Sequence, residues 1–160
     1  MSEEAAPAGA SRVVSAERLI AAPAAEIFEL IADPSLQPRW DGNDNLAEAE
    51  TGQRVHAVGD VFTMALTKDG AVRENHVVEF EEGRRIAWLP APVGERPPGH
   101  LWRWELEEAP GGTLVRHSYD WTELNDPKRM ERARNTTADS LRASVDRLAA
   151  LAERAAEQPE

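Results

Sequence analysis

The spacing of apolar residues changes along this chain, and that change limits the possible folds more than any other feature. From Phe62 to Trp121 apolar and polar residues alternate in several runs, which predicts antiparallel strands joined by short turns. After Asp126-Pro127 the apolar residues recur every third or fourth position, which predicts one amphipathic helix. A strand meander followed by such a helix predicts an α+β fold in which the helix packs on the concave face of a curved antiparallel sheet.

Shorter elements precede the strand meander. Residues 12–20 form a β-like run, and Pro23 then begins a helix that Asp33-Pro34 ends. Asp33 can also cap a second, very short helix that carries Trp40. We therefore expect a sheet of six or seven strands, two short helices after the first strand, and one long C-terminal helix that ends near Ala152.

The chain divides into one domain and two tails. We expect residues 12–152 to fold as a single domain, residues 1–11 to form a disordered N-terminal tail, and residues 153–160 to form a C-terminal tail. Residues 90–99 hold four prolines and two glycines, too many for a strand, so we expect a stiff loop there. This loop is either a lid over a binding site or ordinary surface structure.

Composition excludes several kinds of function. The net charge of −11 argues against a nucleic-acid partner or an anionic membrane surface. The absence of cysteine excludes disulfides, thiolate metal sites and a cysteine nucleophile. The four histidines lack the spacing of metal ligands, so we expect no metal and no cofactor. No apolar segment is long enough for membrane insertion and the first residues do not resemble a signal peptide, so we expect a cytoplasmic protein.

Tryptophan makes up five of the nine aromatic residues. Alternation places Trp102 and Trp104 on the same face of the sheet as His117, Tyr119 and Trp121. Buried tryptophan and tyrosine carry N–H and O–H groups that need partners, so this face is either an unusual core or the wall of a cavity. The same face is expected to hold Phe62, Met64, Trp88 and, from a strand that alternates less cleanly, His76.

His117 and Tyr119 form a candidate catalytic pair. They lie two positions apart on one strand face, so their side chains can reach a common ligand. An imidazole beside a phenol can act as base and acid on an enolisable ketone. The alternative is that both are core polar groups with satisfied hydrogen bonds, and the sequence leaves both interpretations open.

The order of elements resembles the helix-grip fold of the START/SRPBCC superfamily, and in particular its polyketide cyclase/dehydrase-like proteins. The resemblance spans residues 12–152. Segments that carry it include ERLIAAP at 17–23, RWDGN at 39–43, VGDVF at 58–62, VVEF at 77–80 and YDWT at 119–122, and it is their order and spacing together that is specific.

This resemblance implies a cavity between the curved sheet and the C-terminal helix. It implies first a protein that binds a small hydrophobic or aromatic molecule of polyketide or lipid type. One alternative is a cofactor-free polyketide cyclase, aromatase or dehydratase, which would be a lyase that uses His117 and Tyr119. A second alternative is a co-chaperone similar to the heat-shock-chaperone ATPase activator, and either a monomer or a homodimer is compatible with all three. The expected ligand-binding residues are Trp40, Phe62, Met64, His76, Trp88, Trp102, Trp104, Trp121, Met130, Thr137 and Leu141.

Overall fold

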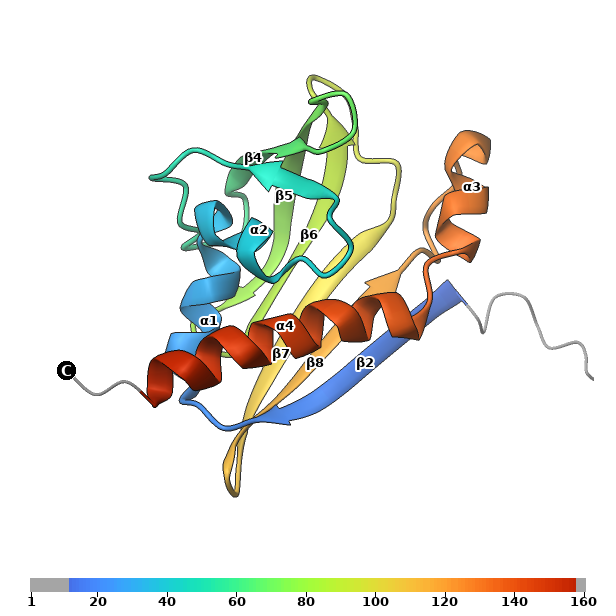
Figure 1. Ribbon diagram of the computed structural model, residues 1–160. Coiled ribbons are helices and arrows are strands. Elements are labelled where there is room, and N and C mark those ends of the chain that lie inside the picture. Colours follow the sequence, from blue (N-terminus) through green and yellow to red (C-terminus); the bar gives the residue numbers. More distant parts are fainter. Residues whose placement is uncertain (1–11, 158–160) are drawn as a thin grey trace, which may run out of the picture.

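A seven-stranded antiparallel sheet curves around a long helix near the C-terminus (Figure 1). The computed structural model describes residues 12–157, so the expected disordered tail 1–11 lies outside the described residues. The strands are β2 (Val13–Ile20), β3 (Leu46–Glu48), β4 (Val61–Leu66), β5 (Val72–Glu81), β6 (Arg85–Pro92), β7 (Leu101–Ala109) and β8 (Gly112–Asp120). The helices are α1 (Ala24–Ala32), the 3-10 turn η2 (Pro34–Leu36), α2 (Gln37–Trp40), α3 (Pro127–Arg134) and α4 (Ala138–Ala156). The predicted α+β helix-grip architecture is confirmed.

The sheet follows the order β2-β8-β7-β6-β5-β4-β3, and all neighbouring strands are antiparallel. The first strand lies at one edge of the sheet beside the last one, and β2 pairs with β8 from Val13 opposite Asp120 to Ile20 opposite Thr113. Helix α4 crosses this half of the sheet (Figure 1). Its inner face buries Leu141, Val145 and Leu148, which form the core together with α1 and the strands.

The C-terminal helix is broken, so the prediction of one continuous helix was wrong. α3 ends at Arg134, and α4 begins at Ala138 with Thr137 as its N-cap. The Thr137 hydroxyl accepts a hydrogen bond from the backbone N–H of Ser140 at 3.2 Å, and the Ser140 hydroxyl accepts one from the backbone N–H of Thr137 at 3.2 Å. These local bonds satisfy the N–H groups of a new helix start, so the chain begins a second helix here.

The end of α4 extends beyond the expected domain boundary. The helix continues to Ala156, so residues 153–156 of the expected C-terminal tail are helical. The Glu153 carboxylate accepts a hydrogen bond from the backbone N–H of Ala21 at 3.0 Å, and Asp146 pairs with Arg18 of β2 at 2.9 Å. The end of the helix is therefore held against the end of the first strand.

Strand β6 runs through Pro90 and Pro92, where the prolines had predicted a loop. Both prolines lie opposite residues of β5, but on its other side β6 pairs with β7 only as far as Trp88. Proline is tolerated in this half of β6 because no neighbour on that side needs its missing N–H group. The actual connection is shortened to residues 93–100, and its role as a lid stays a prediction.

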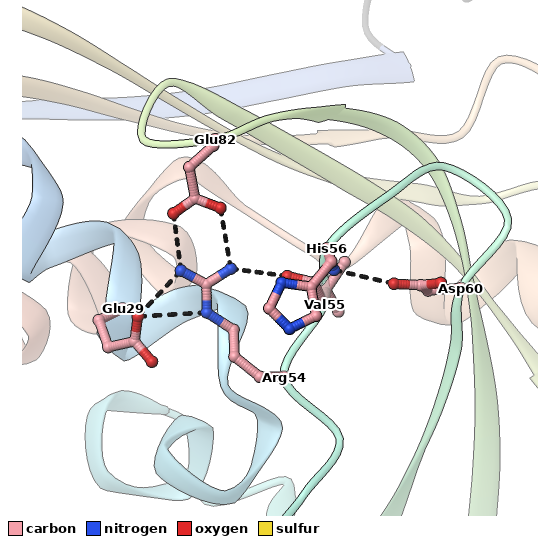
Figure 2. Close-up of polar contacts among 6 residues, drawn as sticks. All are labelled: Glu29, Arg54, Val55, His56, Asp60 and Glu82. Atoms are coloured by element: carbon pink, nitrogen blue, oxygen red, sulfur yellow. Dashed lines mark hydrogen bonds and ion pairs between the residues drawn. The ribbon is translucent and has the colours of Figure 1, made fainter.

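Arg54 holds the connection between β3 and β4 against the rest of the molecule (Figure 2). Its guanidinium lies 2.9 Å from the Glu29 carboxylate of α1 and 2.7 Å from the Glu82 carboxylate at the turn between β5 and β6. It also donates to the carbonyl of Val55 at 2.6 Å. Farther along, the Asp60 carboxylate accepts a hydrogen bond from the backbone N–H of His56 at 2.8 Å (Figure 2). Ion pairs thus fix a segment that contributes few apolar side chains.

Candidate functional site

A cavity of about 370 Å³ lies between the inner face of the sheet and the helices. This volume falls within the range of ~300–1,000 Å³ that is usual for small-molecule sites. The sheet supplies one wall through β4 to β8, and α4 with the loop after α2 supplies the opposite wall. Helix α3 and residue 100 border one end.

The structure brings many of the predicted site residues together around this cavity. Trp40 comes from α2, Met64 from β4 and Leu141 from α4. The other predicted residues that line the cavity all come from the sheet: Trp88, Trp102, Trp104, His117 and Tyr119.

Five predicted residues do not line the cavity, so the expectation is corrected for Phe62, Trp121, Met130, Thr137 and His76. Phe62 lies behind the wall, with its ring edge-on to Trp88 at 5.3 Å between centroids. Trp121 follows the end of β8 and is buried beneath the guanidinium of Arg12, 4.6 Å from its ring centroid. Met130 packs against the core from α3, and Thr137 is exposed because its hydroxyl caps α4.

His76 is also absent from the cavity wall, and a β-bulge explains why the expectation was wrong. In β5 the inner residues are Arg73, Asn75 and Val77, so His76 lies on the opposite face. The pairing of β5 with β6 shifts register between Val77 and Glu79. The extra residue reverses the alternation along the strand. If strict alternation is assumed along the whole of β5, the residues before the bulge, including His76, are assigned to the wrong face.

Three stacked rings form part of the cavity wall. The His117 imidazole lies between two indoles, with centroids 3.8 Å from Trp104 and 5.5 Å from Trp102. His117 Nδ1 lies 3.1 Å from the backbone carbonyl of Arg103. A carbonyl can only accept, so Nδ1 carries the proton and Nε2 is left as an acceptor. Burial lowers the pKa of His117 to about 3, and the ring is therefore neutral at physiological pH.

Trp40 and Tyr119 complete the aromatic lining. The Trp40 N–H donates to the carbonyl of Leu30 at 2.8 Å, and its ring meets Trp104 edge-on at 5.1 Å. Tyr119 lies against Trp102, with centroids 4.4 Å apart. Burial raises the pKa of Tyr119 to about 12, so the phenol keeps its proton.

Two polar atoms of the cavity-lining residues are buried without a partner. Among residues 12–157, only three side-chain nitrogen or oxygen atoms are fully buried with no hydrogen bond: Trp104 Nε1, His100 Nδ1 and His76 Nε2. Trp104 and His100 both line the cavity. An unsatisfied buried polar group costs about 1–3 kcal/mol. A ligand with polar atoms can remove that cost at this site.

A polar loop after α2 forms the side of the cavity that sequence reasoning did not assign. The buried Asp41 carboxylate accepts hydrogen bonds from the backbone N–H groups of Asn43, Asn45 and Leu46, at 3.1, 2.6 and 2.8 Å. The loop is fixed to α4 because Asn43 donates to the carbonyl of Ser140 at 2.9 Å. The RWDGN segment at 39–43 was the feature of the sequence that could have pointed to this loop, although no local pattern showed that it faces a cavity.

Sequence reasoning also missed a basic group at one end of the cavity. Arg73 from β5 lines this end together with Arg129 and Arg132 from α3, and His100 lies beside them. Burial, and after it repulsion by the three guanidinium groups, lowers the pKa of His100 to about 4. The apolar pattern did not predict this group, because it revealed neither the bulge in β5 nor the break before α4.

No group of three or more potential metal ligands occurs among the residues that the structure describes. Within the same residues, no helix has the length and the apolar character needed to cross a membrane.

Comparison with known proteins identifies relatives of this chain. A protein family described as polyketide cyclase / dehydrase and lipid transport matches residues 11–153. An uncharacterised protein of Mycobacterium tuberculosis is 29% identical over 121 residues, which cover 74% of this chain and 50% of that protein. The chain therefore spans about half the length of the curated relatives it matches.

Solved structures with the same fold have low sequence identity. A protein from Mesorhizobium loti superposes with a TM-score of 0.66 at 19% identity, over 89% of this chain and 98% of that one. The Aha1 dimer from Colwellia psychrerythraea gives a TM-score of 0.61 at 14% identity, over 88% and 96% of the two chains. At these identities the likeness is one of fold.

Proposed function

Because the chain belongs to the polyketide cyclase / dehydrase and lipid transport family, we propose that it binds one small, largely aromatic or hydrophobic molecule in the cavity between sheet and α4. The observation that carries this proposal is the aromatic wall of Trp88, Trp102 and Trp104 beside an open volume of about 370 Å³. Indole faces provide apolar contact area together with N–H donors, which suits a planar ligand that carries a few polar atoms.

The protonation states of the candidate catalytic pair favour binding over catalysis. A general base or acid works best when its pKa lies near the working pH. The pKa of His117 is about 3 and that of Tyr119 is about 12, so the first is a weak base and the second a weak acid. Both groups are better suited to hold a ligand: Nε2 of His117 accepts hydrogen bonds, and the phenol of Tyr119 donates them.

The cyclase alternative uses the same two side chains and has a direct test. A variant with both His117→Ala and Tyr119→Phe keeps the strand but loses both proton-transfer groups. If this variant binds ligand normally and retains all the activity found on a poly-β-keto substrate, the pair is not catalytic.

A neutral aromatic probe tests the binding proposal. N-phenylnaphthylamine fluoresces strongly when it leaves water, and we expect it to bind the purified protein with one site per chain. Leu66 lines the cavity from β4, and Leu66→Trp fills part of the volume. This variant should lose about tenfold in probe affinity, or about 1.4 kcal/mol.

The matched control is Leu89→Trp. Leu89 is half-buried like Leu66 but lies on β6 outside the cavity lining. Leu89→Trp introduces the same side chain as Leu66→Trp but outside the cavity, so it should leave the affinity for the probe unchanged. Equal losses in both variants, or no binding to the unmodified protein, would contradict the proposal.

The co-chaperone alternative is supported by likeness of fold alone and is tested separately. Retention of the protein by an immobilised heat-shock chaperone, unaffected by Leu66→Trp, would favour it. Native mass spectrometry of protein purified from its own host addresses two remaining questions together, since it reports a retained small molecule and the number of chains in the assembly.

A further inference from the structure

We propose that the ligand is an anionic amphiphile whose oxyanion head, such as a carboxylate, sulfonate or phosphate, lies among Arg73, Arg129 and Arg132 while its apolar body lies on the tryptophan wall. This inference rests on the proposed function and adds the charge and the orientation of the bound molecule.

Arg73 is the first argument, because its charge is half-buried without a counterion. It lies on the inner face of β5 next to the buried Asn75 and lines the cavity. Among the described residues no carboxylate lies within 4.0 Å of its guanidinium. Arg103, which is similarly buried on the outer face, is held by Glu79 at 2.6 Å. Arg54 is held by two carboxylates.

The one hydrogen bond that the Arg73 guanidinium makes within residues 12–157 is to the backbone carbonyl of Val72, at 3.4 Å. A cation partly withdrawn from water without a counterion is unfavourable, and folded proteins normally pair it. The outer face of this sheet follows that rule at Arg103, and the inner face departs from it at Arg73. The departure is explained if the counterion of Arg73 belongs to a bound molecule. A guanidinium is well suited to that role because its N–H groups match two oxygens of an oxyanion at once.

Two arginines of α3 strengthen the same end of the cavity. Arg129 and Arg132 line it about one helical turn apart, and after burial their charges are the next causes that lower the pKa of Arg73. Only Arg129 has an acidic partner, Asp126 at 3.1 Å. Three cations thus gather in a protein whose net charge is −11, and the acidic groups near them are Asp126, paired with Arg129, and Glu95, which acts on Arg73 only at a distance beyond an ion pair. Such a local reversal of charge attracts an anion to this end of the cavity.

The break between α3 and α4 makes this arrangement possible. A continuous helix would carry residues 129 and 132 onward along the axis of α4, whereas the turn at 135–137 lets α3 project at an angle to α4 (Figure 1). In this position Arg129 and Arg132 line the cavity. Asn135 and Thr136 of that turn also line the cavity. The turn therefore contributes two polar side chains next to the arginines.

The remaining lining gives the ligand its direction. From the arginine end, the wall continues through the neutral groups His100 and Tyr119 to the indoles of Trp102 and Trp88. His100 Nδ1 is buried without a partner and can hydrogen-bond a head-group oxygen in its protonated tautomer. A molecule with one charged end and one apolar end satisfies both parts of the lining, whereas a free anion satisfies only one.

A matched pair of probes tests this inference apart from the proposed function. Anilinonaphthalene sulfonate and N-phenylnaphthylamine share the same ring system, but only the first carries a sulfonate. We expect the sulfonate probe to bind the unmodified protein at least about tenfold more tightly. Arg73→Gln and Arg132→Gln should each lower its affinity about tenfold and change the affinity for the neutral probe much less.

Arg116→Gln is the control, because it removes one positive charge from the outer face of β8, where Arg116 pairs with Glu17. It should not change the affinity for either probe. Inorganic phosphate at matched ionic strength should not displace the sulfonate probe, since phosphate lacks the apolar body.

Three results would overturn the inference. If the neutral probe binds but the sulfonate probe gains nothing, or if Arg73→Gln weakens both probes equally, the arginines do not bind an anionic head and the proposed function still stands. If phosphate displaces the probe, the site is one for small anions. If neither probe binds, the proposed function fails and this inference fails with it.

Discussion

The imidazole of His117 lies flat against the indole of Trp104, with ring centroids 3.8 Å apart and planes inclined by 12°. The Trp104 ring is fully buried, and His117 also stacks with Trp102 and is hydrogen-bonded at its edge to the Arg103 carbonyl. A charged imidazolium in this place would lose its hydration without gaining a carboxylate. The stack therefore requires a neutral histidine, and this has consequences for stability.

We predict that His117 makes the protein sensitive to acid. The unfolded chain takes up a proton at this residue near pH 6.5, but the folded chain does so only near pH 3. Between these values the unfolded state binds more protons, so the free energy of unfolding falls as the pH decreases, by about 1.4 kcal/mol per pH unit for one proton. Urea unfolding of His117→Phe over this pH range should show a slope smaller by that amount. The exposed His56→Gln variant controls for the loss of a histidine, and an unchanged slope in His117→Phe would contradict the prediction.

We predict that an anionic ligand raises the pKa of His100. Burial is the main cause of the low pKa of His100, and Arg129, Arg132 and Arg73 add to it by repelling a proton from this ring, which otherwise faces the neutral Tyr119. Neutralising these arginines should move the pKa from about 4 toward the ordinary value of 6.5. By linkage, the sulfonate probe should bind more tightly as the pH falls through this range. Nuclear magnetic resonance of the imidazole protons measures the change; the neutral probe should not raise the pKa, and an equal rise with both probes would refute the explanation.

We predict that Gly42→Ala destabilises the loop that faces the cavity. A Cβ atom at this position would lie 2.5 Å from the backbone carbonyl carbon of Ala143 in α4. The loop must move away from the helix, which strains the hydrogen bond from the Gly42 N–H to Ser144 Oγ. The expected loss is about 1–3 kcal/mol in unfolding free energy, together with weaker binding of the neutral probe.

A double-variant cycle with Ala143→Gly checks this cause. The added methyl group would also approach the Ala143 Cβ to 2.8 Å, so removing that atom relieves part of the clash. The two substitutions should therefore cost less together than the sum of their separate effects. Strict additivity would show that the close approach is not responsible.

We predict that Arg54→Gln costs about 1–2 kcal/mol of stability, because it removes hydrogen bonds to two carboxylates and a carbonyl at once. The side chains of Glu29 and Glu82 are 50% and 61% exposed, so screening by solvent keeps the loss of stability small. Arg54→Lys should not restore it, since an ammonium cannot bridge both carboxylates in the same plane. The control is Arg84→Gln, which removes an exposed ion pair with Glu81 and should change the midpoint of thermal unfolding very little. Equal effects of the two Gln substitutions would contradict the bridging role.

Alternation alone placed Trp102, Trp104, His117 and Tyr119 on one face, and the structure has them on one cavity wall. That prediction was possible because β7 and β8 pair without a register shift from Leu101 to Ala109. In β5, by contrast, one bulge reverses the alternation of faces, so the prediction assigned His76 to the wrong face. Whether a strand contains a bulge depends on its neighbour as well as on its own residues, so a single period cannot reveal it.

The helical part shows the same division. The apolar stripe correctly identified the helix that packs on the core. The stripe also continued across Thr137 without interruption, although a new helix begins there. The capping bonds between Thr137 and Ser140 hardly change the three- and four-residue spacing of the apolar residues, so the spacing does not reveal the break. The break, and with it the separate placement of Arg129 and Arg132, could not be seen from hydrophobic spacing.

The sequence by itself determined the fold class, the order of the elements and the aromatic face of the sheet, because these depend on periodicity and on turn residues within short stretches of chain. Only the tertiary structure decided that a cavity remains, that the loop at Asp41 closes one side of it, and that Arg73 meets Arg129 and Arg132 at its end. Arg73 lies far from Arg129 and Arg132 in the chain. The strand that carries the first and the helix that carries the other two are not neighbouring elements in the sequence. Their meeting depends on the curvature of the sheet and on where α3 turns away from α4, which no local pattern encodes.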